Sequence, residues 1–244
     1  MGRSKHTFDA DDATLVDTSS TYQTSMAQSS ALQHTIPPNQ SSPARLYHIY
    51  NSLWRHDYNV STGDKAPLYH VNNSSLTPKK PDLTIHAGTS ISAPVVAVCK
   101  FLHFSRHFKV GLGDPQSPNS VTWEDLVCLS FVHVRYRFQM TVDTGNGIER
   151  RPFVWKHTYS VGVGDTKPSL LTWRNFKLVD EATDQLIAVF TSNSWGYKKS
   201  GKLELHANFG QEFDLMVIIT GLALYERQRR QRASSSGGGG GGGG

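Results

Sequence analysis

Two glycine-containing segments are the first places in the sequence that could do chemistry. Residues 111–114 and 162–165 both read Gly-x-Gly-Asp. Closely spaced glycines allow neighbouring backbone N–H groups to converge on an anion, so each segment could bind a phosphate. Neither has the third glycine, the Gly-Lys-Ser/Thr continuation or the helical pattern that typical phosphate-binding loops carry. The sequence therefore favours ordinary turns after strands, in which the aspartate bonds to nearby backbone.

Basic side chains lie near these segments and on one long predicted strand. In residues 132–142 every second position is apolar, and the positions between them are basic or polar, so Arg135 and Arg137 share one strand face. Arginine donates paired hydrogen bonds to phosphate oxygens, so this face could hold a polyphosphate headgroup. A solvated polar face explains the same pattern and stays open as the alternative. The residues predicted to bind an anion or a lipid headgroup are His133, Arg135, Arg137, Arg106, Lys109, Lys156 and His157.

Metal binding and catalysis have weak support. His103 and His107 have the spacing of two ligands on a helix, but they fall in a predicted strand-and-loop region without a Cys-x-x-Cys or His-Glu-x-x-His motif. No Gly-x-Ser-x-Gly motif is present. Cys99 and Cys128 lie among apolar residues, which predicts buried free thiols. We expect no metal, no cofactor and no catalytic residues, and hence a binding module rather than an enzyme.

Composition divides the chain of 244 residues into three parts. Residues 1–43 include 22 Ser, Thr, Gln, Asn or Pro, which predicts a disordered arm. Residues 44–232 contain all five tryptophans and are long enough for one folded domain with a real core. Residues 233–244 are Ser, Ala and Gly, ending in eight glycines, and are expected to be a flexible tail.

Charge gives a first indication of partners. Residues 44–225 hold 19 basic and 15 acidic side chains, within a chain of formal net charge +5. A mildly basic domain favours an anionic phospholipid headgroup or an acidic protein as partner. The arginines at 227, 229, 230 and 232 could contact nucleic-acid phosphates, but they also suit the C-terminal end of a helix, and no DNA- or RNA-binding motif is present, so nucleic acid is not expected. No apolar leader follows the first residues, which predicts a cytoplasmic protein, peripheral to membranes if it binds lipid.

The elements expected to position these residues are short antiparallel strands. Gly-, Pro- and Asn-rich turns separate segments with an alternating apolar pattern, which indicates a mainly β sheet or barrel. Residues 104–123 also match residues 155–173 with one gap, which predicts a repeated strand-and-loop unit. The predicted strands are 54–60, 68–71, 83–87, 95–101, 132–142, 153–161, 173–179, 186–191 and 203–207.

One helix is expected, at the C-terminal end of the domain. Its apolar run, 213–225, has acids in the first turn and arginines after the end, as the helix dipole favours. Apolar residues occupy nearly the whole circumference, which is typical of a buried helix. This run of thirteen residues reaches only about 20 Å, less than the ~30 Å of a bilayer core, so no transmembrane span is expected.

The pattern resembles the tubby C-terminal-like superfamily, which includes the LURP-one-related and phospholipid-scramblase proteins, and within it an uncharacterised fungal family of that fold. The resemblance rests on segments 54–58, 68–71, 86–89, 98–114, 123–126, 177–183 and 213–217. It implies a closed antiparallel barrel of about twelve strands around the hydrophobic C-terminal helix.

The same resemblance implies a non-enzymatic binding or adaptor module for phosphoinositides or another acidic ligand at a membrane surface. Two alternatives stay open: a structural protein-interaction domain without a lipid ligand, and scramblase-like lipid transfer. The Cys-rich segment and acidic calcium loop of scramblases are missing here, which weighs against the latter.

Overall fold

The fold is a barrel of twelve strands and a C-terminal helix. The computed structural model describes residues 43–52, 56–74, 77, 79–132, 134–164, 174–192 and 199–236. The strands are β1 (Arg45–Asn51), β2 (Tyr58–Thr62), β3 (Pro67–Asn73), β4 (Leu83–Ala87), β5 (Val95–Phe101), β6 (Phe108–Leu112), β7 (Thr122–Cys128), β8 (Arg135–Asp143), β9 (Ile148–His157), β10 (Phe176–Asp180), β11 (Leu186–Ser192) and β12 (Lys199–Leu205).

The barrel closes by simple up-and-down pairing. Each strand pairs antiparallel with its neighbours in the sequence, and β1 pairs with β12, so the sheet has no free edge. A short 3₁₀ turn, Pro118–Ser120, connects β6 to β7. The expected closed antiparallel barrel of about twelve strands, with one C-terminal helix, is confirmed.

Strand β8 shows how the alternating pattern becomes a wall. Tyr136, Phe138, Met140 and Val142 are buried, whereas the side chains between them face outward. The turn after Asp143 then leads into β9, with the N–H of Gly145 bonded to the Asp143 carboxylate. The prediction that this strand begins at residue 132 is wrong, because β8 begins at Arg135 and Val132 is 70% exposed in the preceding loop.

The sequence patterns did not predict three of the strands, β1, β6 and β7. The glycine pattern hid β6, because Gly111 lies inside the strand and not in a turn. A Cβ atom at Gly111 would lie 3.0 Å from the Trp123 ring and 2.8 Å from Val121, so glycine makes room there for the neighbouring strand. The proposed repeat is wrong: residues 108–112 form β6, but residues 159–163 do not form a strand, and Phe104 is exposed whereas its counterpart Trp155 is buried.

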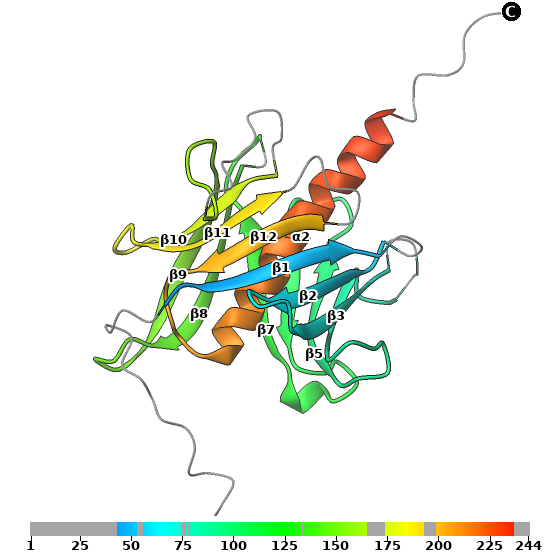
Figure 1. Cartoon of the computed structure of the whole chain (residues 1–244), viewed down its shortest axis with the longest axis horizontal. Coiled ribbons are helices and arrows are strands. Elements are labelled where there is room, and N and C mark those ends of the chain that lie inside the picture. The colour runs from blue at the N-terminus through cyan, green and yellow to red at the C-terminus, as the bar shows by residue number, and fades with distance from the viewer. Residues whose placement is uncertain are drawn as a thin grey trace, which may run out of the picture. The chain divides into compact units, whose positions relative to one another are not determined.

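Helix α2 (Gln211–Ser236) runs through the barrel (Figure 1). Residues 215–226 are all buried, which is more than three turns and therefore includes every face of the helix. The prediction of a buried helix without a solvent-facing stripe holds. The helix continues to Ser236, so residues 233–236 are helical and do not belong to the expected tail. Within the described residues, no helix has the length and apolar character to cross a membrane.

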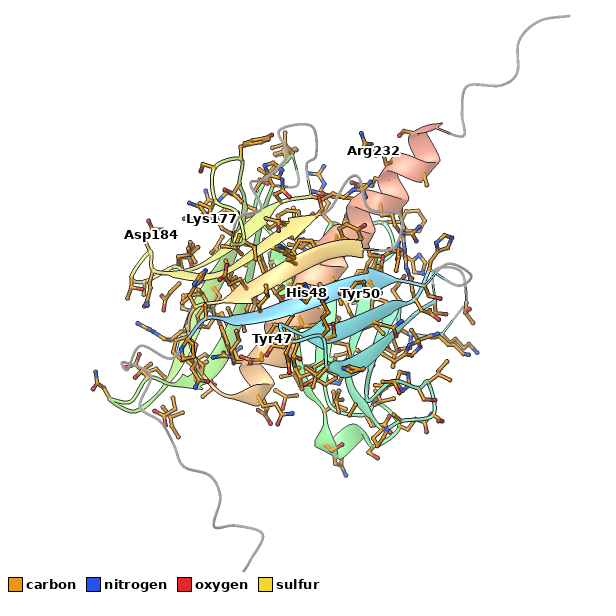
Figure 2. All side chains as sticks on the ribbon, in the orientation of Figure 1. Tyr47, His48, Tyr50, Lys177, Asp184 and Arg232 are labelled. Carbon is orange, nitrogen blue, oxygen red and sulfur yellow. The ribbon has the colours of Figure 1, made fainter. Side chains whose placement is uncertain are left out.

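A carboxylate fixes the first turn of α2 to β1. Arg45 donates two hydrogen bonds to Asp214, of 2.9 Å from Nε and 2.7 Å from Nη2. Tyr47, which is labelled on β1 in Figure 2, donates a third to the same carboxylate at 2.9 Å. Paired donors to a carboxylate restrict direction as well as distance, so they hold the helix start in one position.

Two more polar groups, the Thr220 hydroxyl and the Glu226 carboxylate, fix the middle and the C-terminal half of α2 to the barrel. The indole N–H of Trp155 on β9 donates to the Thr220 hydroxyl at 3.0 Å. Glu226 accepts hydrogen bonds from Tyr58 on β2 and from Arg229 and Arg230. Residues 214, 220 and 226 are six positions apart, so they point in directions about 120° apart around the helix axis. Together they hold the rotation and the height of α2 inside a core that is otherwise apolar.

Candidate functional site

The candidate site lies where the C-terminal half of α2 leaves the barrel, which we call the exit end. The β5–β6 loop, residues 102–107, is held against the helix, because Arg227 donates to the carbonyl oxygens of Arg106 at 2.8 Å and Ser105 at 3.2 Å. The β7–β8 loop, residues 129–134, lies at the same end, since antiparallel strands β5 and β7 both finish there. We call these two segments the exit loops.

The exit loops present large apolar side chains to solvent. Phe131 is 87% exposed and Val132 70% exposed, and Phe104 is fully exposed at the tip of the other loop. Leu102 and Leu129 are each more than 40% exposed on the same loops. Exposed apolar side chains gathered at one place commonly mark a surface that binds a partner or a membrane.

Hydrogen bonds fix the two loops to each other and close the second one. The backbone N–H of Cys128, at the end of β7, donates to Nδ1 of His107 at 2.9 Å, and this bond joins the two loops. Ser130 Oγ accepts hydrogen bonds from the N–H groups of Val134 and Arg135, at 2.9 and 3.1 Å, which closes the second loop. The apolar tips are therefore held out from the barrel by internal bonds.

Three cations lie at the exit-end positions of neighbouring strands. Arg135, Lys156 and Lys177 are cross-strand neighbours on β8, β9 and β10, and we call these three residues the cation row. These like charges lie opposite one another across the strands and repel. Among the described residues, the row has one ion-pair partner, Asp184, which lies 3.1 Å from Lys156. Arg106 lies over the Phe131 ring at 4.9 Å, so a cation also contacts an apolar tip. Neither exit loop contains Asp or Glu.

The structure brings together only part of the predicted headgroup site. Arg135, Lys156 and Arg106 belong to the exit end, and His157 at the end of β9 packs edge-on against Tyr159 with ring centres 4.4 Å apart. Arg137 is on the predicted face but forms a 2.7 Å ion pair with Glu181. Lys109 pairs with Asp125 at 3.1 Å on β7. His133 lies outside the described residues.

Two kinds of residue were missing from the sequence prediction. Lys177 completes the cation row, but only the β9–β10 register places it opposite Lys156. Phe131 and Val132 lie just before a strand. An apolar pair at that position is interpreted from sequence as part of the buried strand and not as a loop. The available signal was Ser130 before them, a residue whose hydroxyl often closes a turn.

The basic residues 227–232 lie within the last turns of α2, and several of them bind partners inside the domain. Arg229 donates to Glu226, and Arg230 donates to Glu226, to Asp82 at 2.6 Å and to Asn73 at 2.8 Å. These arginines attach the helix to the β3–β4 side of the barrel.

The first Gly-x-Gly-Asp segment is a structural turn. The N–H of Gly113 donates to the Val96 carbonyl at 2.8 Å, and Asp114 accepts the N–H of Gln116 at 2.9 Å. The Gly113 N–H is therefore not available to an anion, and the predicted turn is confirmed for this segment. In the second segment, Asp165 lies outside the described residues.

The two cysteines are free and differ in burial. Cys99 is free and fully buried, and burial raises the pKa of its thiol. Cys128 is free but half-buried, so the expectation of two buried thiols is wrong for it; its Sγ lies 3.2 Å from the Ser130 carbonyl. Among the described side chains no group of three or more His, Cys, Asp or Glu is placed to hold a metal ion.

Comparisons with protein-family models, with curated proteins and with solved structures find no match to this chain. The tubby-like resemblance therefore stays a prediction from the sequence.

Proposed function

We propose that this chain is a non-enzymatic binding module that attaches peripherally to anionic membrane surfaces by its exit end. The observation that carries the proposal is the pairing of exposed apolar tips, above all Phe131 and Val132, with the cation row and Arg106. A peripheral protein binds an anionic bilayer through two contributions, the burial of apolar side chains and the attraction of cations to anionic lipids, and the exit end carries residues for both.

The expected energies agree with reversible attachment. Burying a Phe or Val side chain in an apolar phase contributes roughly 1.5–3 kcal/mol. A Lys or Arg close to an anionic surface contributes about 1 kcal/mol, and salt screens this attraction. Two or three apolar tips and a few cations therefore give several kcal/mol, which is enough for attachment and too little for permanent anchoring.

The rigidity of the exit loops supports the same function. The bonds from Arg227 to the first loop and from Cys128 to His107 hold the apolar tips in position. Little conformational entropy is then lost when the tips enter the headgroup region. A loop that had to fold on the membrane would lose part of its binding energy to that ordering.

Vesicle cosedimentation tests the proposal. The full chain is mixed with phosphatidylcholine vesicles or with vesicles that also contain phosphatidylserine, at low and at high sodium chloride. We expect binding to the anionic vesicles that weakens with salt, and much weaker binding to the neutral ones. Equal binding to both vesicles, or none to either, contradicts the proposal; absence of binding would favour a protein-interaction domain with a protein partner on the same apolar tips.

A further inference from the structure

A hollow of about 450 Å³ lies over β2, in the barrel wall between β1 and β3. Asn59 and Ser61 of β2 line it, together with Lys65 from the β2–β3 turn and Thr89 from the β4–β5 loop. Asn59 is the exposed position between two buried residues of β2, so the hollow opens on the outer face of the barrel. None of its lining residues belongs to the exit loops or to the cation row. The hollow is therefore separate from the proposed membrane surface.

The pairing of β2 with β3 is irregular beside the hollow. The register shifts in a β-bulge just before Ser61, and Ser61 lies opposite Pro67, which has no N–H group to give to the ladder. The N–H of Gly88 donates to the Leu68 carbonyl at 3.1 Å, which holds the β4–β5 loop, and Thr89 with it, against β3. Backbone features of neighbouring segments therefore shape the hollow.

Ser61 points to a bound ligand. The residue lines the hollow and is only 6% exposed, yet its Oγ has no hydrogen-bond partner among the described residues. Leaving a buried hydroxyl unpaired costs free energy, and nearly all such groups in folded proteins have a partner. A ligand with an acceptor atom in the hollow would receive the Ser61 hydroxyl hydrogen and remove this cost.

The other polar groups around the hollow also favour an acceptor. Lys65 forms no ion pair with any described residue, and no acidic side chain lines the hollow. Asp64, next in the turn, does not line it, and its carboxylate accepts the Thr62 hydroxyl. Asn59 uses its Oδ1 in a 3.1 Å bond with a histidine ring, which leaves its Nδ2 hydrogens for another acceptor. One ammonium group with neutral donors suits a single negative charge, as in a carboxylate, whereas phosphate sites typically use the paired donors of arginine.

Rings make up much of the remaining lining. Tyr50, which is labelled on β1 in Figure 2, lines the hollow with Pro67 and Tyr69 of β3. Sites for small molecules are typically apolar hollows of about 300–1,000 Å³ in which a few polar groups fix the orientation of the ligand. An aromatic ring packs well against such side chains. The lining therefore suits a ligand with an aromatic body and one charged end.

We infer that this hollow binds a small aromatic carboxylate. Its ring packs against Tyr50 and Pro67, and its carboxylate accepts hydrogen bonds from the Ser61 hydroxyl and the Lys65 ammonium. This site does not depend on the proposed membrane function, because it shares no residue with the exit end. The two proposals can therefore fail independently.

Isothermal titration calorimetry of the full chain tests the site with naphthalene carboxylate and with naphthalene carboxamide, which has the same ring system and no charge. We expect the carboxylate to bind about tenfold more tightly than the amide, because hydrogen bonds to an ionised acceptor are stronger. Ser61→Ala should weaken the carboxylate about tenfold, and Lys65→Gln, at an exposed position, by a smaller factor. Equal binding of the two probes, or no binding of the carboxylate, overturns the inference.

Control variants show where the probe binds. Lys79→Gln removes a second exposed lysine, in the β3–β4 loop outside the hollow, whose φ of 68° matches the 67° of Lys65, and it should bind the probe like wild type. Phe131→Ser, at the exit end, should also bind it like wild type. Loss of the probe in Phe131→Ser, or equal binding by Ser61→Ala and wild type, overturns the site.

The stability of Ser61→Ala provides a readout without any ligand. The substitution deletes a buried hydroxyl that has no partner, so urea unfolding should give a free energy equal to or higher than that of wild type. Weaker probe binding by this variant then reflects the lost hydroxyl and not a damaged fold. A large loss of stability would show that the hydroxyl already has a partner in the folded chain, which also overturns the inference.

Discussion

Tyr58 on β2 donates a hydrogen bond across the barrel interior to Glu226, a fully buried carboxylate on α2. Arg229 and Arg230 donate to the same carboxylate, and Arg230 continues to Asp82 and Asn73. The network joins the helix to the β2–β4 side of the barrel, next to Arg227, which holds the β5–β6 loop. The position of the proposed membrane-facing surface therefore depends on a buried ion network.

Loss of the Glu226 charge should destabilise the fold strongly. Glu226→Gln leaves Arg229 and Arg230 without their buried anion, and breaking such a network costs about 3–5 kcal/mol. Urea unfolding followed by tryptophan fluorescence measures the effect. Glu212→Gln, an exposed acid in the first turn of the same helix, is the matched control and should change the free energy of unfolding by less than about 0.5 kcal/mol. Equal small effects of the two variants would show that the network contributes little.

The same carboxylate predicts a dependence of stability on acid. Burial opposes ionisation of Glu226, but hydrogen bonds from Arg229, Tyr58 and Arg230 outweigh it and lower its pKa from 4.5 to about 2. A lowered pKa in the folded state contributes stability that is complete above about pH 4.5 and is lost as pH falls towards 2. The shift corresponds to about 3 kcal/mol. Unfolding measured from pH 6 down to about pH 2 should show this loss in wild type and a shallower one in Glu226→Gln; parallel curves would refute the assignment.

Thr220 links the middle of the helix to the barrel wall. Its hydroxyl accepts the Trp155 N–H at 3.0 Å and donates to the Met216 carbonyl at 2.7 Å. Thr220→Val keeps the shape but leaves a buried indole N–H without an acceptor, which should cost about 1–3 kcal/mol. Thr220→Ser keeps the hydroxyl, so its free energy of unfolding should fall by less than that of Thr220→Val. Thermal unfolding of both variants compares them, and an equal loss would place the effect in packing alone.

Gly113 should tolerate no side chain. Its φ is +113°, and a Cβ atom there would lie 2.5 Å from the Ser120 carbonyl oxygen. Gly113→Ala should destabilise by about 2 kcal/mol or more, because the backbone strain and the clash add. Gly147→Ala is the control, since its φ is +143° but nothing lies within 4 Å of the added Cβ. The difference in unfolding free energy between the variants measures the clash, and no difference would contradict the close approach at Gly113.

The cation row should set the charge dependence of vesicle binding. Arg135→Glu reverses one charge beside the apolar tips, so affinity for phosphatidylserine vesicles should fall by about 2 kcal/mol, roughly 30-fold. Lys65→Glu makes the same change in the β2–β3 turn at the other end of the barrel and should have a much smaller effect. Equal losses would mean that the net charge of the domain, rather than the exit end, governs binding.

The sequence predicted the barrel better than the site. Alternation in residues 132–142 and the apolar circumference of α2 were enough to indicate a wall and a buried helix, because both patterns are local. Val132 and Val134 continued the same alternation, so the pattern did not show that the strand begins at Arg135, and Ser130 was the local signal of a turn before it. Whether Arg137 was free depended on Glu181, and the place of Lys177 depended on the β9–β10 register. Contacts between residues far apart in the sequence decide such points, and a single sequence does not carry them.

The most direct test of the membrane function compares the affinity of Phe131→Ser and Ile148→Ser for phosphatidylserine vesicles by cosedimentation. Phe131 is 87% exposed at the exit end, and Ile148 is 78% exposed at the β8–β9 hairpin on the opposite end. Both variants remove one exposed apolar side chain, so both should fold normally. The membrane function predicts that Phe131→Ser weakens binding by about 1.5–3 kcal/mol, at least tenfold, and that Ile148→Ser binds like wild type. Equal binding by the two variants would contradict attachment through the exit end.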